Sequence, residues 1–160
     1  MRRVLAGAVV FAIGLSLNCS SSGGVGGPSG AQMSWLDDGI AVTPFGADAT
    51  LTSSNGVDSL RIDGLTQGAA GSVTIILGAA SPFAPQTFDC TQLVGGQTVT
   101  ISYATGTGFD ITDQSCKVVV TQVGKVGGPS LMGTFEAVIS LTPSGTKTIS
   151  KGTFNVPVQM

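Results

Sequence analysis

The chain contains no histidine, and only 10% of its 160 residues are charged. The absence of histidine removes the most frequent general base, the usual activator of a serine or cysteine nucleophile, and the commonest metal ligand. A typical soluble protein carries about 25% charged residues, so the surface is poor in groups that could perform acid–base chemistry. We therefore expect no enzyme, no catalytic residue, no metal site and no cofactor.

Positive charge is scarcer still. From Cys19 onward the chain carries five Lys or Arg residues and nine Asp or Glu residues, a net charge of −4. Without a basic patch the chain is not expected to bind nucleic acid. Its polar character rests on Ser, Asn, Gln and 18 threonines, and threonine suits the half-exposed face of a β-sheet.

The first residues follow the pattern of an export signal. Arg2 and Arg3 precede the run Val4 to Leu17, which contains no charged residue and is almost wholly apolar. A positive start followed by 14 apolar residues has the proportions of a secretory signal peptide. A membrane-spanning helix needs about 20 such residues, so this run is too short to cross a bilayer. We predict a signal peptide over residues 1–18.

A single cysteine, Cys19, ends the apolar segment. This arrangement resembles the lipobox of bacterial lipoproteins, although Ser16 and Asn18 stand where the lipobox usually has leucine and a small residue. The resemblance implies cleavage before Cys19, lipidation of Cys19 and attachment to a membrane. Ser20 directly after the cysteine resembles the sorting signal of outer-membrane lipoproteins. The resemblance implies that the domain faces the periplasm or the cell surface. The alternative is cleavage near residues 20–24, which would release a soluble secreted module that binds a carbohydrate or a protein.

Residues 19–30 are expected to connect this cysteine to the folded domain. Ser20 to Gly30 contains only Ser, Gly, Val and one Pro. A flexible Gly/Ser chain of this length has a root-mean-square reach of roughly 18 Å. We predict a tether over residues 19–30 and one folded domain over residues 31–160.

Two cysteines remain in the domain, Cys90 and Cys116, 26 positions apart. A chain with an export signal meets an oxidising compartment, where a disulfide is the expected state. The alternative is two separate buried thiols. Neither cysteine has a second cysteine nearby in the sequence, which argues against a metal site.

Short runs with a period of two, separated by Gly, Asn, Asp and Pro, predict an all-β domain. Asp37-Asp38-Gly39 and Asn55-Gly56 each lie between two such runs and predict tight hairpins. The segment 79–94 looks irregular. Nine strands are expected, at residues 33–36, 40–43, 50–53, 59–63, 72–77, 97–103, 116–123, 133–141 and 152–158.

The end of the chain repeats the motif Gly-Thr-Phe, at residues 133–135 and 152–154. The repeat predicts a long antiparallel hairpin with both Phe rings in one core, turning at Pro143-Ser144-Gly145. Pro157 cannot donate a ladder hydrogen bond, so the last strand should lie at an edge or end there. The small N-terminal hairpin and the terminal strand pair resemble an uncharacterised family of Gram-negative lipoprotein domains, of unknown function and all-β form. We predict a β-sandwich or an open barrel.

Few side chains are candidates for a ligand contact. Trp35 and Tyr103 are the only aromatic residues with a polar group, and they could stack on a sugar or a peptide or else plug the core. The acidic residues are most simply explained as parts of turns and solvated loops, and two functional roles are the alternatives. Asp110 and Asp113 could contribute oxygen atoms to a calcium site, although two carboxylates are too few. An enzyme would require a deep pocket that unites two of the residues Asp37, Asp110, Asp113 and Glu136.

Overall fold

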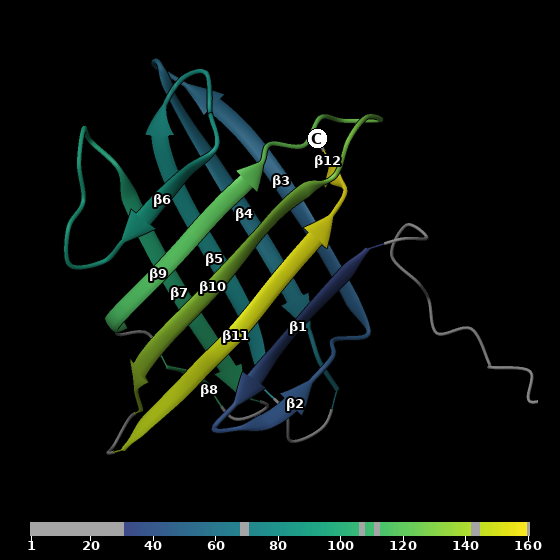
Figure 1. The fold of residues 1–160 in the computed structure, drawn as a ribbon, viewed down its shortest axis with the longest axis vertical. Helices are drawn as coiled ribbons and strands as arrows, with labels where there is room; N and C mark the ends of the chain where they lie inside the picture. Colours follow the sequence, from purple (N-terminus) through teal and green to yellow (C-terminus); the bar gives the residue numbers. More distant parts are fainter. Residues whose placement is uncertain (1–30, 68–70, 106–107, 111–112, 142–144, 160) are drawn as a thin grey trace, which may run out of the picture.

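The computed structural model describes residues 31–67, 71–105, 108–110, 113–141 and 145–159, and all regular structure among them is β-strand. This described part contains twelve strands, whose arrangement can be followed in Figure 1. They are β1 (Gln32–Asp37), β2 (Ile40–Val42), β3 (Gly46–Ser54), β4 (Val57–Leu65), β5 (Ser72–Ala80), β6 (Gln86–Asp89), β7 (Thr98–Thr105), β8 (Gly108–Asp110), β9 (Asp113–Gln122), β10 (Leu131–Ser140), β11 (Thr146–Val156) and β12 (Val158–Gln159).

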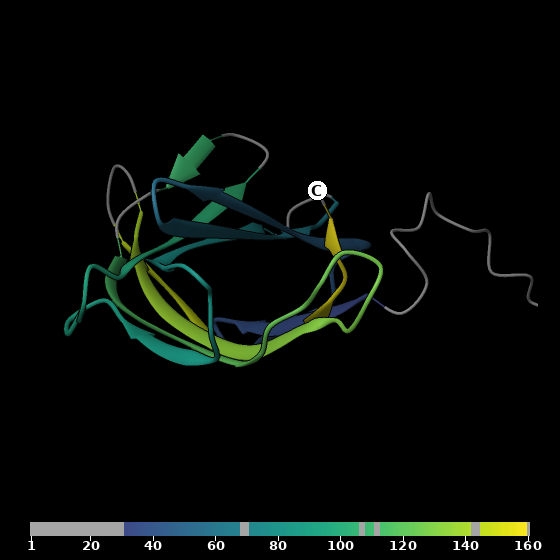
Figure 2. The same ribbon diagram turned by 90° about the horizontal axis from the view of Figure 1, so that it is seen from above.

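The strands form two sheets that pack face to face, as Figure 2 shows from above. Sheet A has the order β2-β1-β11-β10-β9-β6, and sheet B has the order β12-β3-β4-β5-β7-β8. Of the two predicted architectures, the sandwich is therefore the correct one. Burial alternates along the strands, which places one face of each sheet in a shared core.

Both predicted two-residue hairpins are confirmed. Asp38 and Gly39 join β1 to β2, and Asn55 and Gly56 join β3 to β4. All four residues have positive φ angles, between 48° and 86°. This backbone conformation twists a tight turn in the same sense as the strands that it connects, and Asn, Asp and Gly adopt it at the lowest cost.

The nine predicted strands correspond to β1–β5, β7 and β9–β11, and the three strands that were not predicted are short. β6 lies inside the segment 79–94, which was wrongly expected to be irregular throughout. β12 exists because the chain leaves β11 after Val156, passes Pro157 and pairs with β3 of the opposite sheet. The last predicted strand was expected to lie at a sheet edge or to end at Pro157. It ends at Pro157, because β11 lies inside sheet A between β1 and β10.

The core is built from alternating positions of the strands. Val73, Ile75 and Leu77 of β5 are fully buried, and so is Val118 of β9. Three of the aromatic rings on the inner face of sheet A lie next to one another: the Trp35 and Phe135 centroids are 6.3 Å apart, and those of Phe135 and Phe154 are 6.4 Å apart. Both Phe residues of the repeated motif thus share one core, as expected.

A disulfide joins Cys90 to Cys116, with 5.1 Å between the two Cα atoms. Cys116 lies in β9, and Cys90 directly follows β6. The Cys90 backbone N–H also donates to the Cys116 carbonyl oxygen, at 3.0 Å. The bond attaches the segment after β6 to β9, so the predicted disulfide is confirmed and the alternative of two separate thiols is wrong.

Candidate functional site

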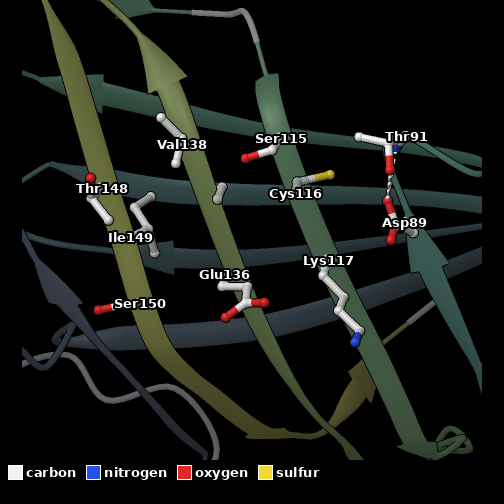
Figure 3. Close-up of a pocket in the computed structure, with 11 residues that line it drawn as sticks. Asp89, Thr91, Ser115, Cys116, Lys117, Glu136, Val138, Thr148, Ile149 and Ser150 are labelled. Atoms are coloured by element: carbon white, nitrogen blue, oxygen red, sulfur yellow. Dashed lines mark hydrogen bonds between the residues drawn. The ribbon is translucent and has the colours of Figure 1, made fainter.

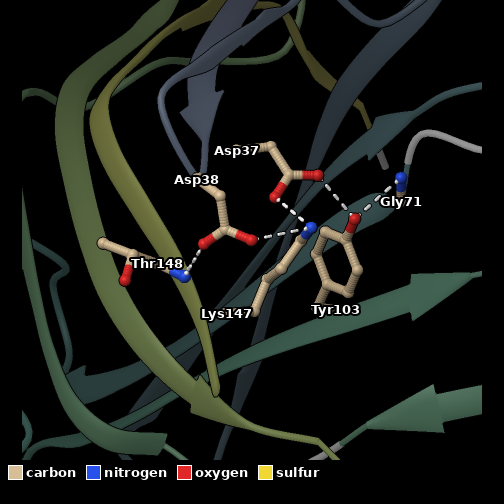
Figure 4. A network of polar contacts seen from close by, with 6 residues as sticks. All are labelled: Asp37, Asp38, Gly71, Tyr103, Lys147 and Thr148. Carbon is tan, nitrogen blue, oxygen red and sulfur yellow. Dashed lines mark hydrogen bonds and ion pairs between the residues drawn. The ribbon is translucent and has the colours of Figure 1, made fainter. Parts of the chain in front are cut away.

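A cluster of polar side chains spans the two sheets at one end of the sandwich (Figure 4). We call it the cross-sheet cluster: Asp37, Asp38, Tyr103 and Lys147. The Lys147 Nζ atom lies 2.8 Å from Asp37 Oδ1 and 3.0 Å from Asp38 Oδ2. Tyr103, on sheet B, donates its hydroxyl hydrogen to Asp37 Oδ2 at 2.7 Å. The cluster therefore links β1 and β11 of sheet A to β7 of sheet B.

Two backbone groups complete the cluster. The Gly71 N–H donates to the Tyr103 hydroxyl oxygen at 3.0 Å, and the Thr148 N–H donates to Asp38 Oδ1 at 2.8 Å. Asp37 and Tyr103 are 7% and 2% exposed. Lys147 lies at the rim, with 23% of its side chain exposed. A buried charge is stable only when it is paired and hydrogen-bonded, and Asp37 meets both conditions.

The pKa shifts of the cluster all favour the ion-paired form. The hydrogen bond to Asp37, followed in importance by the one to Asp38, raises the pKa of Lys147 above its ordinary value. Burial and then the hydrogen bond to Asp37 raise the pKa of Tyr103 to about 12. The Thr148 N–H and Lys147 lower the pKa of Asp38. A group that must exchange protons near neutral pH needs a pKa near 7, so these shifts suit a structural clamp.

Trp35 and Tyr103 are both 2% exposed. Their rings are covered by the packed sheets, so they plug the core, and the hypothesis that they contact a ligand is not supported at these positions. The Trp35 Nε1 atom is buried without a hydrogen-bond partner in the described part of the chain. Tyr103, by contrast, uses its hydroxyl group to join the two sheets.

A second buried carboxylate, Asp58, binds the loop that connects β5 of sheet B to β6 of sheet A. Asp58 Oδ2 accepts a hydrogen bond from the Phe83 N–H at 2.7 Å, and Asp58 Oδ1 accepts one from the Ser53 hydroxyl. Both hydrogen bonds lower the pKa of Asp58, and the one from Ser53 has the larger effect. Phe83 in turn stacks on Phe88 of β6, with 5.7 Å between the ring centroids. Asp58 therefore positions the loop that leads to the edge strand of sheet A.

The outer face of sheet A carries an open hollow of about 320 Å³, shown in Figure 3. We call it the outer hollow. Its charged residues are Asp89 beside β9, Lys117 on β9 and Glu136 on β10, and Ser115, Thr148 and Ser150 supply hydroxyl groups. Glu136 and Lys117 are directly opposite on neighbouring strands. A neighbouring hollow shares both residues and adds Lys151. The surface suits a polar ligand with both donors and acceptors.

Lys151 has a φ angle of +51° in the middle of β11. The pairing of β11 shifts at this point against both neighbouring strands. An extra residue here forms a β-bulge, so the residues facing the core change from odd numbers (Lys147, Ile149) to even numbers (Gly152, Phe154). The bulge is what allows Lys147 and Phe154 to lie on the same face of one strand.

Of the four acidic residues considered for an enzyme site, the structure describes the side chains of Asp37 and Glu136, and it does not bring these two together. Asp37 faces the core, whereas Glu136 is exposed on the opposite face of sheet A. The side chains of Asp110 and Asp113 lie outside the described part of the chain, and so do Ile111 and Thr112 between them. No group of three acidic or cysteine residues within the described ranges could hold a metal ion.

Cys19 and the predicted tether lie outside the described residues. Among the described elements no helix is long and apolar enough to span a bilayer. The partner that sequence reasoning missed is Lys147, which lies 110 positions from Asp37. Two adjacent aspartates at a hairpin turn gave no indication that both would meet one lysine.

Comparisons of the chain with protein-family models, with curated proteins and with solved structures find no match. The resemblance to an uncharacterised lipoprotein family therefore gains no support from them.

Proposed function

We propose that this protein is a membrane-anchored lipoprotein whose β-sandwich binds or scaffolds a partner without catalysing a reaction. One observation carries the proposal: Cys19 stands between an apolar run of signal-peptide length and an uncharged Ser/Gly-rich segment. Acylation of Cys19 would hold the domain at the outer membrane, and the tether would leave it free to meet a partner. Each buried CH₂ group of an acyl chain adds about 0.8 kcal/mol of membrane affinity, so several chains together give lasting attachment.

The disulfide supports a location outside the cytoplasm. Structural disulfides persist in oxidising compartments and are rare in the cytosol. The Cys90–Cys116 bond of the folded domain is therefore consistent with export. The first strand of the described part begins at Gln32, so cleavage before Cys19 and a tether over residues 19–30 would take no residue from the described sandwich.

For the binding surface we propose the outer hollow. It places a carboxylate (Glu136), an ammonium group (Lys117) and several hydroxyl groups on an open sheet face. Such a face offers hydrogen-bond donors and acceptors to an extended polar ligand, such as a peptide or a glycan. The alternative is a soluble secreted module with the same surface.

The test is the state of Cys19 in the protein from a host that acylates lipoproteins. We expect an intact mass that corresponds to an acylated Cys19 as the first residue, and recovery in the detergent phase after phase separation. Cys19→Ala should lose both properties, whereas the matched variant Ser22→Ala should keep them. An unmodified N-terminus downstream of Cys19 would defeat the proposal and favour the secreted module.

A further inference from the structure

Three large apolar side chains are exposed together at one corner of the sandwich. They are Ile40 of β2, Phe45 before β3 and Leu65 at the end of β4, with 72%, 52% and 47% of their surfaces exposed. We call them the apolar corner. Ile40 and Phe45 line one open hollow, and the Phe45 N–H donates to the Leu65 carbonyl oxygen at 3.0 Å. Exposed apolar side chains that gather in this way mark an interaction surface.

The side chains of the apolar corner and of its hollow carry no charge, and the nearby Asp38 is ion-paired with Lys147. Neither residues 39–47 nor residues 64–72 contain Asp, Glu, Lys or Arg. The other residues that line the hollow are Ala41, Val42, Thr43, Thr66 and Gln67. None of these lining side chains carries a charge that would oppose entry into the apolar boundary of a bilayer, whereas even one buried unpaired charge would do so.

The domain also joins its N-terminal segment at this corner. Ala31, the first described residue, lines a second hollow together with Pro44 and Phe45. In Figure 1 the start of β1 and the connection from β2 to β3 lie on the same side, away from the connection between β6 and β7. Only residues 20–30 separate Ala31 from Cys19, and a flexible chain of that length reaches roughly 18 Å.

We propose that the apolar corner docks into the headgroup and acyl boundary of the phospholipid bilayer that holds the Cys19 anchor. This inference rests on the proposed lipoprotein function. The anchor keeps the corner near the bilayer at high effective concentration, so three side chains suffice for docking that would be weak in free solution. The net charge of −4 from Cys19 onward offers no attraction to anionic lipids, so docking is driven by apolar contact and depends little on salt.

Docking would orient the sandwich. With the apolar corner on the bilayer, the hairpin turn Asn55-Gly56 would point away from it, because β3 runs from Gly46 beside the corner to Ser54 at the opposite end. The apolar corner would then be the part of the domain that contacts the bilayer, and the outer hollow would have a fixed orientation relative to the membrane.

The test compares two variants of the acylated protein, each with one added cysteine as its free thiol and labelled there with an environment-sensitive fluorophore. Thr43→Cys places the label between Ile40 and Phe45, and Ser54→Cys places it at the far end of β3; both positions are exposed. The vesicles contain phosphatidylethanolamine and phosphatidylcholine, with and without brominated lipid. We expect a blue shift and quenching by brominated lipid at position 43, and neither effect at position 54. Ile40→Ser combined with Phe45→Ser should abolish the effects at position 43.

The outcomes separate the two proposals, because intact mass and vesicle co-sedimentation report the anchor independently of the label. An acylated, vesicle-bound protein whose label at position 43 behaves like that at position 54 overturns docking alone. Quenching at both positions also overturns it, because the bilayer would then not select the corner. A shift at position 43 that rises with protein concentration in the absence of vesicles assigns the corner to a second copy of the chain. An unacylated, aqueous protein overturns both proposals.

Discussion

The ring of Phe135 lies against the backbone of Gly152, its cross-strand partner in the β10–β11 ladder. A Cβ atom added at Gly152 would come within 2.6 Å of two carbon atoms of that ring. The reciprocal pair is Gly133 and Phe154, where an added Cβ would meet both the Phe154 ring and the Val119 carbonyl oxygen. The two copies of the Gly-Thr-Phe motif therefore fit each other: the glycine of each strand lacks a side chain, and the phenylalanine of the other strand fills that space.

Gly152→Ala should destabilise the fold, because the methyl group overlaps both the Phe135 ring and the Phe135 carbonyl oxygen. Overpacking of this kind costs about 1–3 kcal/mol of unfolding free energy, measurable by urea denaturation. The matched control is Gly46→Ala, at the start of β3, where an added Cβ meets nothing within 4 Å. Equal stabilities of the two variants would contradict the account.

Lys151→Gly should stabilise the fold. A non-glycine residue at a φ angle of +51° crowds its own backbone, which costs on the order of 1 kcal/mol, and glycine removes that cost. After the loss from the greater freedom of the unfolded glycine chain, we expect a gain of about 0.5 kcal/mol in urea denaturation. Lys125→Gly, at an exposed loop position, should give no gain. A loss of stability in Lys151→Gly would show that the bulge does not strain this residue.

Lys147→Met should leave the buried Asp37 carboxylate without its opposite charge. Breaking one partner of a buried pair costs about 3–5 kcal/mol, and we expect about 2–4 kcal/mol because Lys147 lies at the rim. Lys125→Met removes the same charge from an exposed loop and should change the free energy of unfolding by less than about 0.5 kcal/mol. If both variants unfold at the same urea concentration, the cluster is not a clamp.

Tyr103→Phe should weaken the fold at neutral pH and flatten its alkaline transition. The variant loses the hydrogen bonds to Asp37 and from Gly71, at a cost of about 1–3 kcal/mol. In the native protein the pKa of Tyr103 is raised to about 12, so between pH 10 and 12 the unfolded chain loses its proton while the folded chain keeps it. Stability therefore falls over this window. The raised pKa of Lys147 acts in the same direction, so Tyr103→Phe should reduce the fall without removing it. Parallel stability curves from pH 9 to 12 would contradict the assignment.

Reduction of the Cys90–Cys116 bond should lower the free energy of unfolding. The loop that it closes spans 26 positions, for which chain entropy gives about 3–4 kcal/mol. The measurement is urea denaturation with and without reductant. Thiol labelling of the unfolded, unreduced protein should find neither cysteine reactive, and Cys19→Ala should leave this result unchanged. Labelling of both cysteines without reductant would refute the bond.

Local patterns were sufficient for most of the sandwich. Alternation located the eight longer strands among the nine predicted, because a half-buried strand places every second side chain in the core, and the Asp-Gly turn located the short β2. Asp38-Gly39 and Asn55-Gly56 predicted their turns, since these residues favour positive φ angles. The strands that were not predicted, β6, β8 and β12, have two to four residues, too few to show a period, and unlike β2 they follow no Asp-Gly or Asn-Gly turn.

The candidate sites were less predictable than the fold. The bulge at Lys151 changes which residues of β11 face the core, and no feature of the motif Ser-Lys-Gly-Thr-Phe announces it. Without that extra residue, Lys147 would face outward and could not meet Asp37. Lys117 and Glu136 are distant in the sequence, and only the pairing of β9 with β10 places them opposite each other.

By itself the sequence determined the all-β class, the hairpin turns and the inward residues of most strands, because these depend on neighbours within a few positions. It also pairs an export-type apolar run with Cys19, the basis of the proposed anchor. Only the tertiary structure decided which strands lie side by side, and therefore that Asp37, Tyr103 and Lys147 form one cluster and that Ile40, Phe45 and Leu65 share one corner. These contacts join residues from distant parts of the chain, and they depend on the free energy of the whole packed sandwich.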